Sequence, residues 1–166
     1  SMEKGTGSER SEVPVPFSNL RTRRNTSWQA GFHILFPMRP VIVCGLGRFG
    51  LQVVEALRGC GCPVTFVSDG NTSPERVERA EAAGARFVRG DFRTPAARQE
   101  AGLADAQAVV ITTASDVDNL EAALEVRGEA PDVRVVMRHS QPRLSKRFET
   151  DFGIVAAMAP AELAAG

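Results

Sequence analysis

Short apolar runs alternate along most of the chain with segments whose apolar residues have helical spacing. The apolar runs cover residues 41–44, 63–68, 85–89, 106–113, 133–138 and 154–158. Most are short, continuous and rich in β-branched residues, as expected of strands covered on both faces of a parallel sheet. Five helical segments separate them, at residues 48–59, 73–84, 94–101, 115–127 and 141–150. The pattern predicts an α/β fold, a doubly wound, Rossmann-like parallel sheet of six strands with helices on both faces.

Capping signals mark where several of these helices begin. Ser73 precedes Pro74, which suits an N-cap followed by proline in the first helical turn. Thr94 is expected to cap the short fourth segment. Gly84 is expected to end the second helix.

The first part of the chain has a different character. Residues 1–38 show no sustained periodicity, so we expect an N-terminal tether that is partly disordered, followed by one domain over residues 39–166. Arg21, Arg23 and Arg24 form a basic cluster, either a contact for acidic lipid or a partner, or a solvated charge run.

Composition narrows the function classes. The chain has 20 basic and 20 acidic residues, so it carries no overall field that would attract nucleic acid. Cys44, Cys60 and Cys62 are too few for a disulfide framework, and no histidine group completes a metal site. No apolar run approaches the roughly 20 residues that span a bilayer. We therefore expect a soluble, intracellular chain without a metal.

The first strand leads into a glycine-rich turn, Gly45-Leu-Gly-Arg-Phe-Gly50. In a turn of this kind the first glycine permits the tight bend, Gly47 lets the backbone approach a pyrophosphate, and Gly50 allows the helix to pack closely on the strand. The start of the following helix then offers an anion site. The alternative is a tight turn that binds nothing.

Polar residues follow the other strands, at the edge of the sheet where ligands bind in such folds. Ser68 and Asp69 lie 23 and 24 residues after Gly45, about where an acidic side chain takes ribose hydroxyls. Which of the two faces the site stays open; with Ser68 there, a 2′-phosphate becomes tolerable. The other candidates are Asp91, Thr112, Thr113, Ser115 and Arg138.

Two of these candidates have an alternative role, and a third has a charge that favours the site. Asp91 can instead cap a turn, and Ser115 can be only the N-cap of the next helix. Arg138 is a cation at the mouth of a parallel sheet, which favours phosphate contact.

The combination of motifs resembles a known family. The segments are VIVCGLGRFGLQVVEALRGCGCPVTFVSD, GARFVRGDF, DAQAVVITTASDVDNLEAAL and VRVVMRHSQP. Together they resemble the nucleotide-binding half of RCK (regulator of K+ conductance) domains, the Trk-type N-terminal domains of potassium channels, transporters and glutathione-gated efflux systems. The resemblance covers roughly residues 40–160.

The resemblance implies a cytoplasmic regulatory module at the inner face of the cell membrane, not an enzyme. It implies binding of NAD(H), NADP(H) or an adenine nucleotide such as ADP, ATP or AMP. It also implies pairing with copies of itself and action on a membrane pore or transporter subunit. Strand two departs from the family, whose members usually carry an acidic residue where this chain has Ser68-Asp69.

The cofactor-binding residues that the motif and the resemblance together predict lie in the glycine turn and at the strand ends. They are Gly45, Leu46, Gly47, Arg48, Phe49, Gly50, Ser68, Asp69, Asp91, Phe92, Thr112, Thr113, Ser115 and Arg138.

The resemblance also suggests how copies assemble. The chain reaches only the beginning of the family's crossover helix, so we expect a truncated domain and a weak homodimer through helices at the sheet edge. The expected apolar contacts are Leu120, Leu124, Leu144 and Phe148.

Two other functions remain open. One is a small NAD(P)-dependent oxidoreductase, which needs a proton donor or acceptor near the nicotinamide. The chain has no tyrosine, and its histidines are His33, in the tether, and His139, expected in a solvent-facing loop. The other is an assembly module that has lost its ligand.

Overall fold

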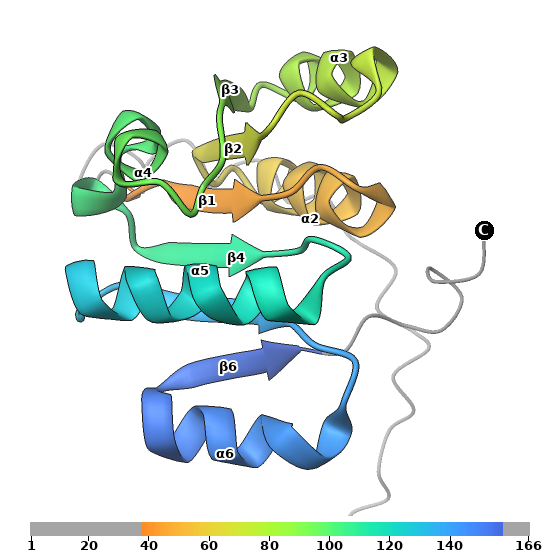
Figure 1. The fold of residues 1–166 in the computed structure, drawn as a ribbon. Coiled ribbons are helices and arrows are strands. Elements are labelled where there is room, and N and C mark those ends of the chain that lie inside the picture. The colour runs from red at the N-terminus through yellow and green to blue at the C-terminus, as the bar shows by residue number, and fades with distance from the viewer. Residues whose placement is uncertain (1–37, 158–166) are drawn as a thin grey trace, which may run out of the picture. The chain divides into compact units, whose positions relative to one another are not determined.

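Six parallel strands form one sheet in the computed structural model, which describes residues 38–157. The strands are β1 (Val41–Cys44), β2 (Val64–Ser68), β3 (Arg86–Arg89), β4 (Ala108–Ile111), β5 (Arg134–Arg138) and β6 (Ile154–Ala157). Their order is β3-β2-β1-β4-β5-β6 (Figure 1). Every adjacent pair is parallel. The predicted doubly wound α/β fold is confirmed.

The helices connect successive strands. They are α2 (Arg48–Gly59), α3 (Pro74–Ala82), α4 (Pro95–Ala101), α5 (Asp116–Glu129) and α6 (Pro142–Phe152), and a 3-10 helix covers Leu103–Asp105. Among these described helices, none is both long and apolar enough to cross a bilayer.

Two buried clusters lie on the two faces of the sheet because successive strand side chains point to opposite sides. Val43 and Val41 pack in one cluster with apolar residues of α2 and α3. Ile42 and Cys44 pack in the other, with residues of α4, α5 and α6. All four side chains of β1 are therefore buried, as the uninterrupted apolar run predicted.

The strand order reverses between β1 and β4. The helix that follows β1 packs on one face and the helix that follows β4 packs on the other. In doubly wound sheets, such a switch point leaves a crevice at the carboxyl ends of the strands.

The capping predictions hold at two of three helices. The Thr94 hydroxyl accepts from the backbone N–H of Ala97 at 3.4 Å, and the Ser115 hydroxyl accepts from that of Asp118 at 3.2 Å. Ser73 precedes α3 but forms no side-chain cap, because its hydroxyl makes no bond to the helix N–H groups.

Several predicted boundaries extend too far. β4 ends at Ile111 rather than at Thr113, and β5 begins at Arg134. The apolar composition of these runs continues past the last residues that pair with a neighbouring strand. The predicted tether, His33, Met158 and the crossover helix lie outside the described residues.

Three of the four apolar residues expected at a dimer contact are buried or partly buried. Phe148, expected on an outer face for pairing, is only 8% exposed and belongs to the core. Leu120 and Leu144 are partly buried against that core, so of the four expected contacts Leu124 alone is exposed.

Candidate functional site

The glycine turn has the geometry that its sequence predicts. Gly45 has φ +86°, in the left-handed region, and its N–H donates to the Val67 carbonyl at 2.9 Å. A Cβ on Gly50 would lie 2.0 Å from the Gly45 carbonyl oxygen, so only glycine lets α2 begin this close to the strand. A Cβ on Gly47 would meet nothing within 4 Å. The backbone of Gly47 therefore borders open space at the start of α2.

A cavity of about 450 Å³ lies at the carboxyl ends of β1, β2, β3 and β4. Nine of the predicted site residues line it: Gly45, Leu46, Gly47, Ser68, Asp69, Asp91, Phe92, Thr112 and Thr113. The remaining five, Arg48, Phe49, Gly50, Ser115 and Arg138, are not part of this lining. The structure thus brings together residues from four loops that are up to 68 positions apart.

Ser68 and Asp69 lie at the end of β2, and the sequence did not decide which of them faces the site. Ser68 is 6% exposed, and its hydroxyl hydrogen-bonds the hydroxyl of Thr72. Asp69 is exposed, and its two carboxylate oxygens accept from the backbone N–H and the side-chain amide of Asn71, at 3.1 and 3.0 Å. Both residues border the cavity.

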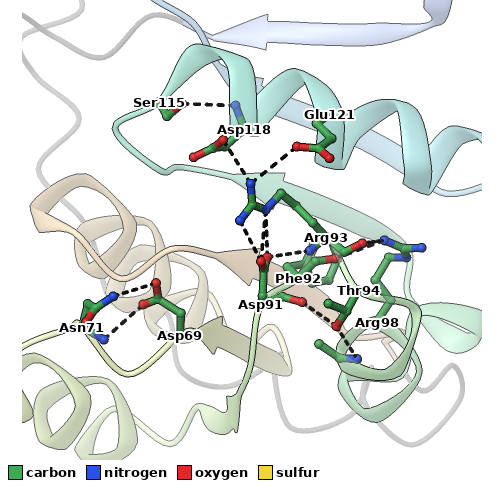
Figure 2. Close-up of polar contacts among 11 residues, drawn as sticks. Asp69, Asn71, Asp91, Phe92, Arg93, Thr94, Arg98, Ser115, Asp118 and Glu121 are labelled. Atoms are coloured by element: carbon green, nitrogen blue, oxygen red, sulfur yellow. Dashed lines mark hydrogen bonds and ion pairs between the residues drawn. The ribbon is translucent and has the colours of Figure 1, made fainter.

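An ion cluster centred on Arg93 lines the part of the cavity between the end of β3 and α5 (Figure 2). Arg93 donates to both carboxylate oxygens of Asp91. It also reaches Asp118 at 3.2 Å and Glu121 at 3.5 Å on α5. The hydrogen bond from Arg93 holds the pKa of Asp91 below its ordinary value. The surrounding carboxylates, Asp91 first, raise the pKa of Arg93.

The sequence reasoning missed Arg93 and its partners on α5. The available signal was local: Arg93 follows the Gly-Asp pair by two residues, and Asp118 and Glu121 are three apart on one helix face.

A buried arginine, Arg98, binds both the turn after β3 and α5. Arg98 is 2% exposed and donates to the carbonyls of Phe92 and Arg93, at 3.3 and 2.7 Å. It also reaches Glu129 at 2.6 Å and Glu125 at 3.3 Å on α5. Arg98 therefore ties the turn after β3 to α5, and this role was not predicted.

Threonines after β4 connect the cavity floor to the neighbouring strands. The Thr112 hydroxyl donates to the carbonyls of Cys44 and Gly45, at 2.9 and 2.7 Å. The Thr113 hydroxyl pairs with the side-chain oxygen of Asn119, which is fully buried, at 2.5 Å. Arg138 donates to the Thr113 carbonyl at 2.9 Å, so in this structure its guanidinium braces the strand ends.

A second hollow, of about 380 Å³, lies between α2 and α3. Arg48 and Arg79 line it together with Glu55 and Glu75, and Arg76 lines both hollows. Arg48 was a predicted site residue, whereas Arg76 was not.

His139 is buried, which corrects its expected place in solvent. Its exposure is 6%, and its ring packs edge-on against Phe148 with the ring centres 4.9 Å apart. Its Nδ1 lies 3.4 Å from a carboxylate oxygen of Asp116. Burial raises the pKa of Asp116, but hydrogen bonds from Ser140 outweigh it and lower the pKa overall.

The family model of the TrkA-N domain matches residues 41–160. The chain belongs to the TrkA-N family. This confirms the resemblance to RCK-type domains. A comparison with curated proteins finds no match.

Solved structures of other TrkA-N and RCK proteins share this fold. The TrkA-N domain of inner membrane protein ybaL from Escherichia coli is 23% identical, with a TM-score of 0.63, over 76% of this chain and 92% of that one. The AMP-bound Kef CTD of Shewanella denitrificans is 21% identical, with a TM-score of 0.62, over 75% and 73%. The GsuK channel bound to NAD is 17% identical, with a TM-score of 0.59, over 71% and 21%.

Proposed function

We propose that this TrkA-N domain is a cytosolic regulatory domain that binds a nucleotide and couples binding to potassium transport. The ligand is NAD(H), NADP(H) or an adenine nucleotide. One observation carries the proposal: the glycine turn lines a 450 Å³ cavity at the strand-order reversal, and its Gly47 backbone borders open space there. This is where doubly wound folds bind nucleotide phosphates.

The residues present fit such a ligand. Gly47 is the N-cap of α2 and carries no side chain that would occupy the first N–H groups, which leaves them for phosphate oxygens. Asp69 and Thr113, at the strand ends, offer oxygen atoms to ribose hydroxyls. A bound nucleotide would thus contact β1, β2 and β4 together.

Calorimetry with the full chain tests the proposal, using NAD(H), NADP(H), ADP, ATP and AMP in turn. Gly47→Val should abolish binding, because its side chain would fill the space above the turn while meeting no protein atom at Cβ. Gly59→Val is the matched control, since Gly59 ends the same helix and its Cβ is equally free. Binding that survives Gly47→Val in a folded protein, or no heat with any nucleotide, would contradict the proposal.

An oxidoreductase is the second candidate, and the structure offers it less support. The chain has no tyrosine, and His139 lies in the core outside the cavity lining. Turnover of carbonyl substrates with NADH or NADPH would favour this alternative. A module without a ligand is the third candidate, and the calorimetry series distinguishes it.

We further propose that the domain acts at the inner face of the cell membrane, with a pore or transporter subunit, as a homo-oligomer. The similarity to a domain of inner membrane protein ybaL and to the GsuK channel supports a membrane partner.

A further inference from the structure

The two hollows described above differ in charge where they meet at Arg76. The lining of the larger cavity includes three aspartates, Asp69, Asp91 and Asp118, and two arginines, Arg76 and Arg93. Arg93 is already engaged by Asp91 and Asp118. That side of the cavity therefore offers a further anion little attraction.

The hollow between α2 and α3 is cationic instead. Three arginines face two glutamates there, and Arg79 is paired with Glu55 at 2.7 Å. Within residues 38–157, the guanidinium groups of Arg48 and Arg76 form no hydrogen bond or ion pair. Among the described residues, nothing engages these two guanidiniums, and Arg76 also borders the larger cavity.

Arg76 and the end of β2 both line the larger cavity. A carboxylate in the last position of this strand accepts ribose hydroxyls and repels a phosphate, whereas a nearby arginine accommodates a 2′-phosphate. Here the last residue of β2 is Ser68, whose hydroxyl is neutral. The next residue, Asp69, has both oxygens engaged by Asn71, although its charge remains.

We propose that the nucleotide of this domain carries a phosphate on its adenosine ribose, at the 2′ position as in NADP(H), and that Arg76, assisted by Arg48, selects it. The inference rests on the proposed function and names the ligand class of that same site. Arg76 is a specificity-determining residue, because its guanidinium is available to the extra phosphate. The charge of Asp69 limits the expected preference to about tenfold, the value of one partly exposed charge-assisted contact.

Calorimetry at fixed ionic strength tests the inference with matched pairs of ligands. NADPH should bind about tenfold more tightly than NADH, and 2′,5′-ADP more tightly than 5′-AMP. A third arm uses 3′,5′-ADP, which places the same phosphate chemistry on the other ribose hydroxyl. If 3′,5′-ADP binds more tightly than 2′,5′-ADP, the assignment to the 2′ position is overturned.

Variants then connect the preference to Arg76. Arg76→Ala should bring the ratio of the NADH and NADPH dissociation constants close to one, and Arg76→Lys should retain part of the preference. Arg143→Ala, on α6 beyond the other edge of the sheet, removes the same charge and should keep the full ratio. Melting curves verify that each variant is folded.

The outcomes separate the two proposals. Equal affinity for NADPH and NADH, or a preference that survives Arg76→Ala, would overturn the inference and leave nucleotide binding in place. No binding of any nucleotide would overturn the proposed function, and the inference with it.

Discussion

The arginines in and near the cavity differ in whether other groups of the protein already engage their guanidiniums. Arg98 is buried against two carbonyls and two glutamates, and Arg93 is held by three carboxylates. Arg138 donates to the Thr113 carbonyl. Arg76 has no such partner within the described part of the chain. Which cation can meet a ligand is therefore decided by long-range contacts that residue type alone does not reveal.

Removing the arginine of the ion cluster should change the titration of its main partner. In Arg93→Met we expect the pKa of Asp91 to rise toward the ordinary value of about 4, because the hydrogen bond and charge that lower it are lost. NMR titration of the Asp91 carboxyl carbon measures this directly. An unchanged pKa would mean that Arg93 does not hold Asp91 in solution.

The lowered pKa of Asp91 also predicts how the stability of the protein changes with pH. A carboxyl group whose folded pKa is depressed contributes stability above its unfolded pKa and loses it as pH falls through the folded pKa. The folded protein should thus lose stability below about pH 4, and Arg93→Met should lose less over that range. Both groups are exposed, so the difference will be small.

Arg98 gives a stability prediction. Arg98→Ala should lower the free energy of unfolding by about 2–4 kcal/mol, because it leaves a cavity and removes the donor to two carbonyls. Arg98→Met should cost less, since methionine fills much of the volume. Urea unfolding of both variants provides the measurement. A loss below about 1 kcal/mol in Arg98→Ala would show that the turn does not depend on this residue.

Among site residues, the sequence predicted those whose role is set locally. Gly45 and Gly50 were assigned from the turn motif, and their φ value and close contact agree with it. The sequence did not predict Arg93, or Arg76 of the proposed phosphate site, because the other residues of the cavity lining come from several elements. Arg138 was predicted to contact phosphate because it is a cation at a strand end. Its bond to the Thr113 carbonyl depends on the pairing of β4 with β5, which no local pattern specifies.

At the scale of elements, the unit formed by β1, the glycine turn and α2 depends on contact between backbones. Gly50→Ala should be strongly destabilising, by about 3 kcal/mol or more, because its Cβ would lie 2.0 Å from the Gly45 carbonyl oxygen and 2.7 Å from the Thr112 hydroxyl. Thermal and urea unfolding measure the loss. A variant as stable as the parent would show that α2 can move away from the strand without cost.

Gly128→Ala is the control for that substitution. Gly128 lies near the end of α5, and its Cβ would meet nothing within 4 Å. Alanine is the better helix former, so stability should stay the same or rise by up to about 1 kcal/mol. If Gly128→Ala also lowered the stability, the effect of replacing glycine could not be assigned to a steric clash of the added Cβ.

The elements themselves were largely predictable because their signals are periodic and local. The six strands and five α-helices of residues 38–157 fall within or close to the predicted ranges. The ends were less predictable: a strand ends where its neighbour stops pairing, so Thr112 and Thr113 continue an apolar run but lie beyond the last paired residue of β4. The burial of Phe148 and His139 was not predicted either, because their two rings pack against each other only in the folded chain.

At the scale of the whole molecule, the exposed apolar side chains suggest how copies meet. Val117 is 76% exposed and Leu124 is 41% exposed, and they are seven residues apart on α5, which places them on one face of the helix. Phe148, once a candidate for the same surface, is buried. In residues 38–157, the other exposed large apolar residues are Met38, Phe152 and Val155, none of which lies on α5. The apolar patch on α5 is therefore small, and small interfaces give weak association.

We therefore expect a weak homodimer whose population rises with protein concentration, and sedimentation velocity over a concentration series tests it. Leu124→Lys should shift the chain toward monomer, because it places a charge on the apolar face of α5 in both copies. Met38→Lys serves as the control, since Met38 is similarly exposed, at 39%, but precedes β1 rather than lying on α5. Equal weakening by both substitutions would place the contact elsewhere than on α5. A sedimentation coefficient that stays monomeric up to the highest concentration reached would contradict the proposed pairing itself, while leaving the proposed nucleotide site, which lies within one chain, untouched.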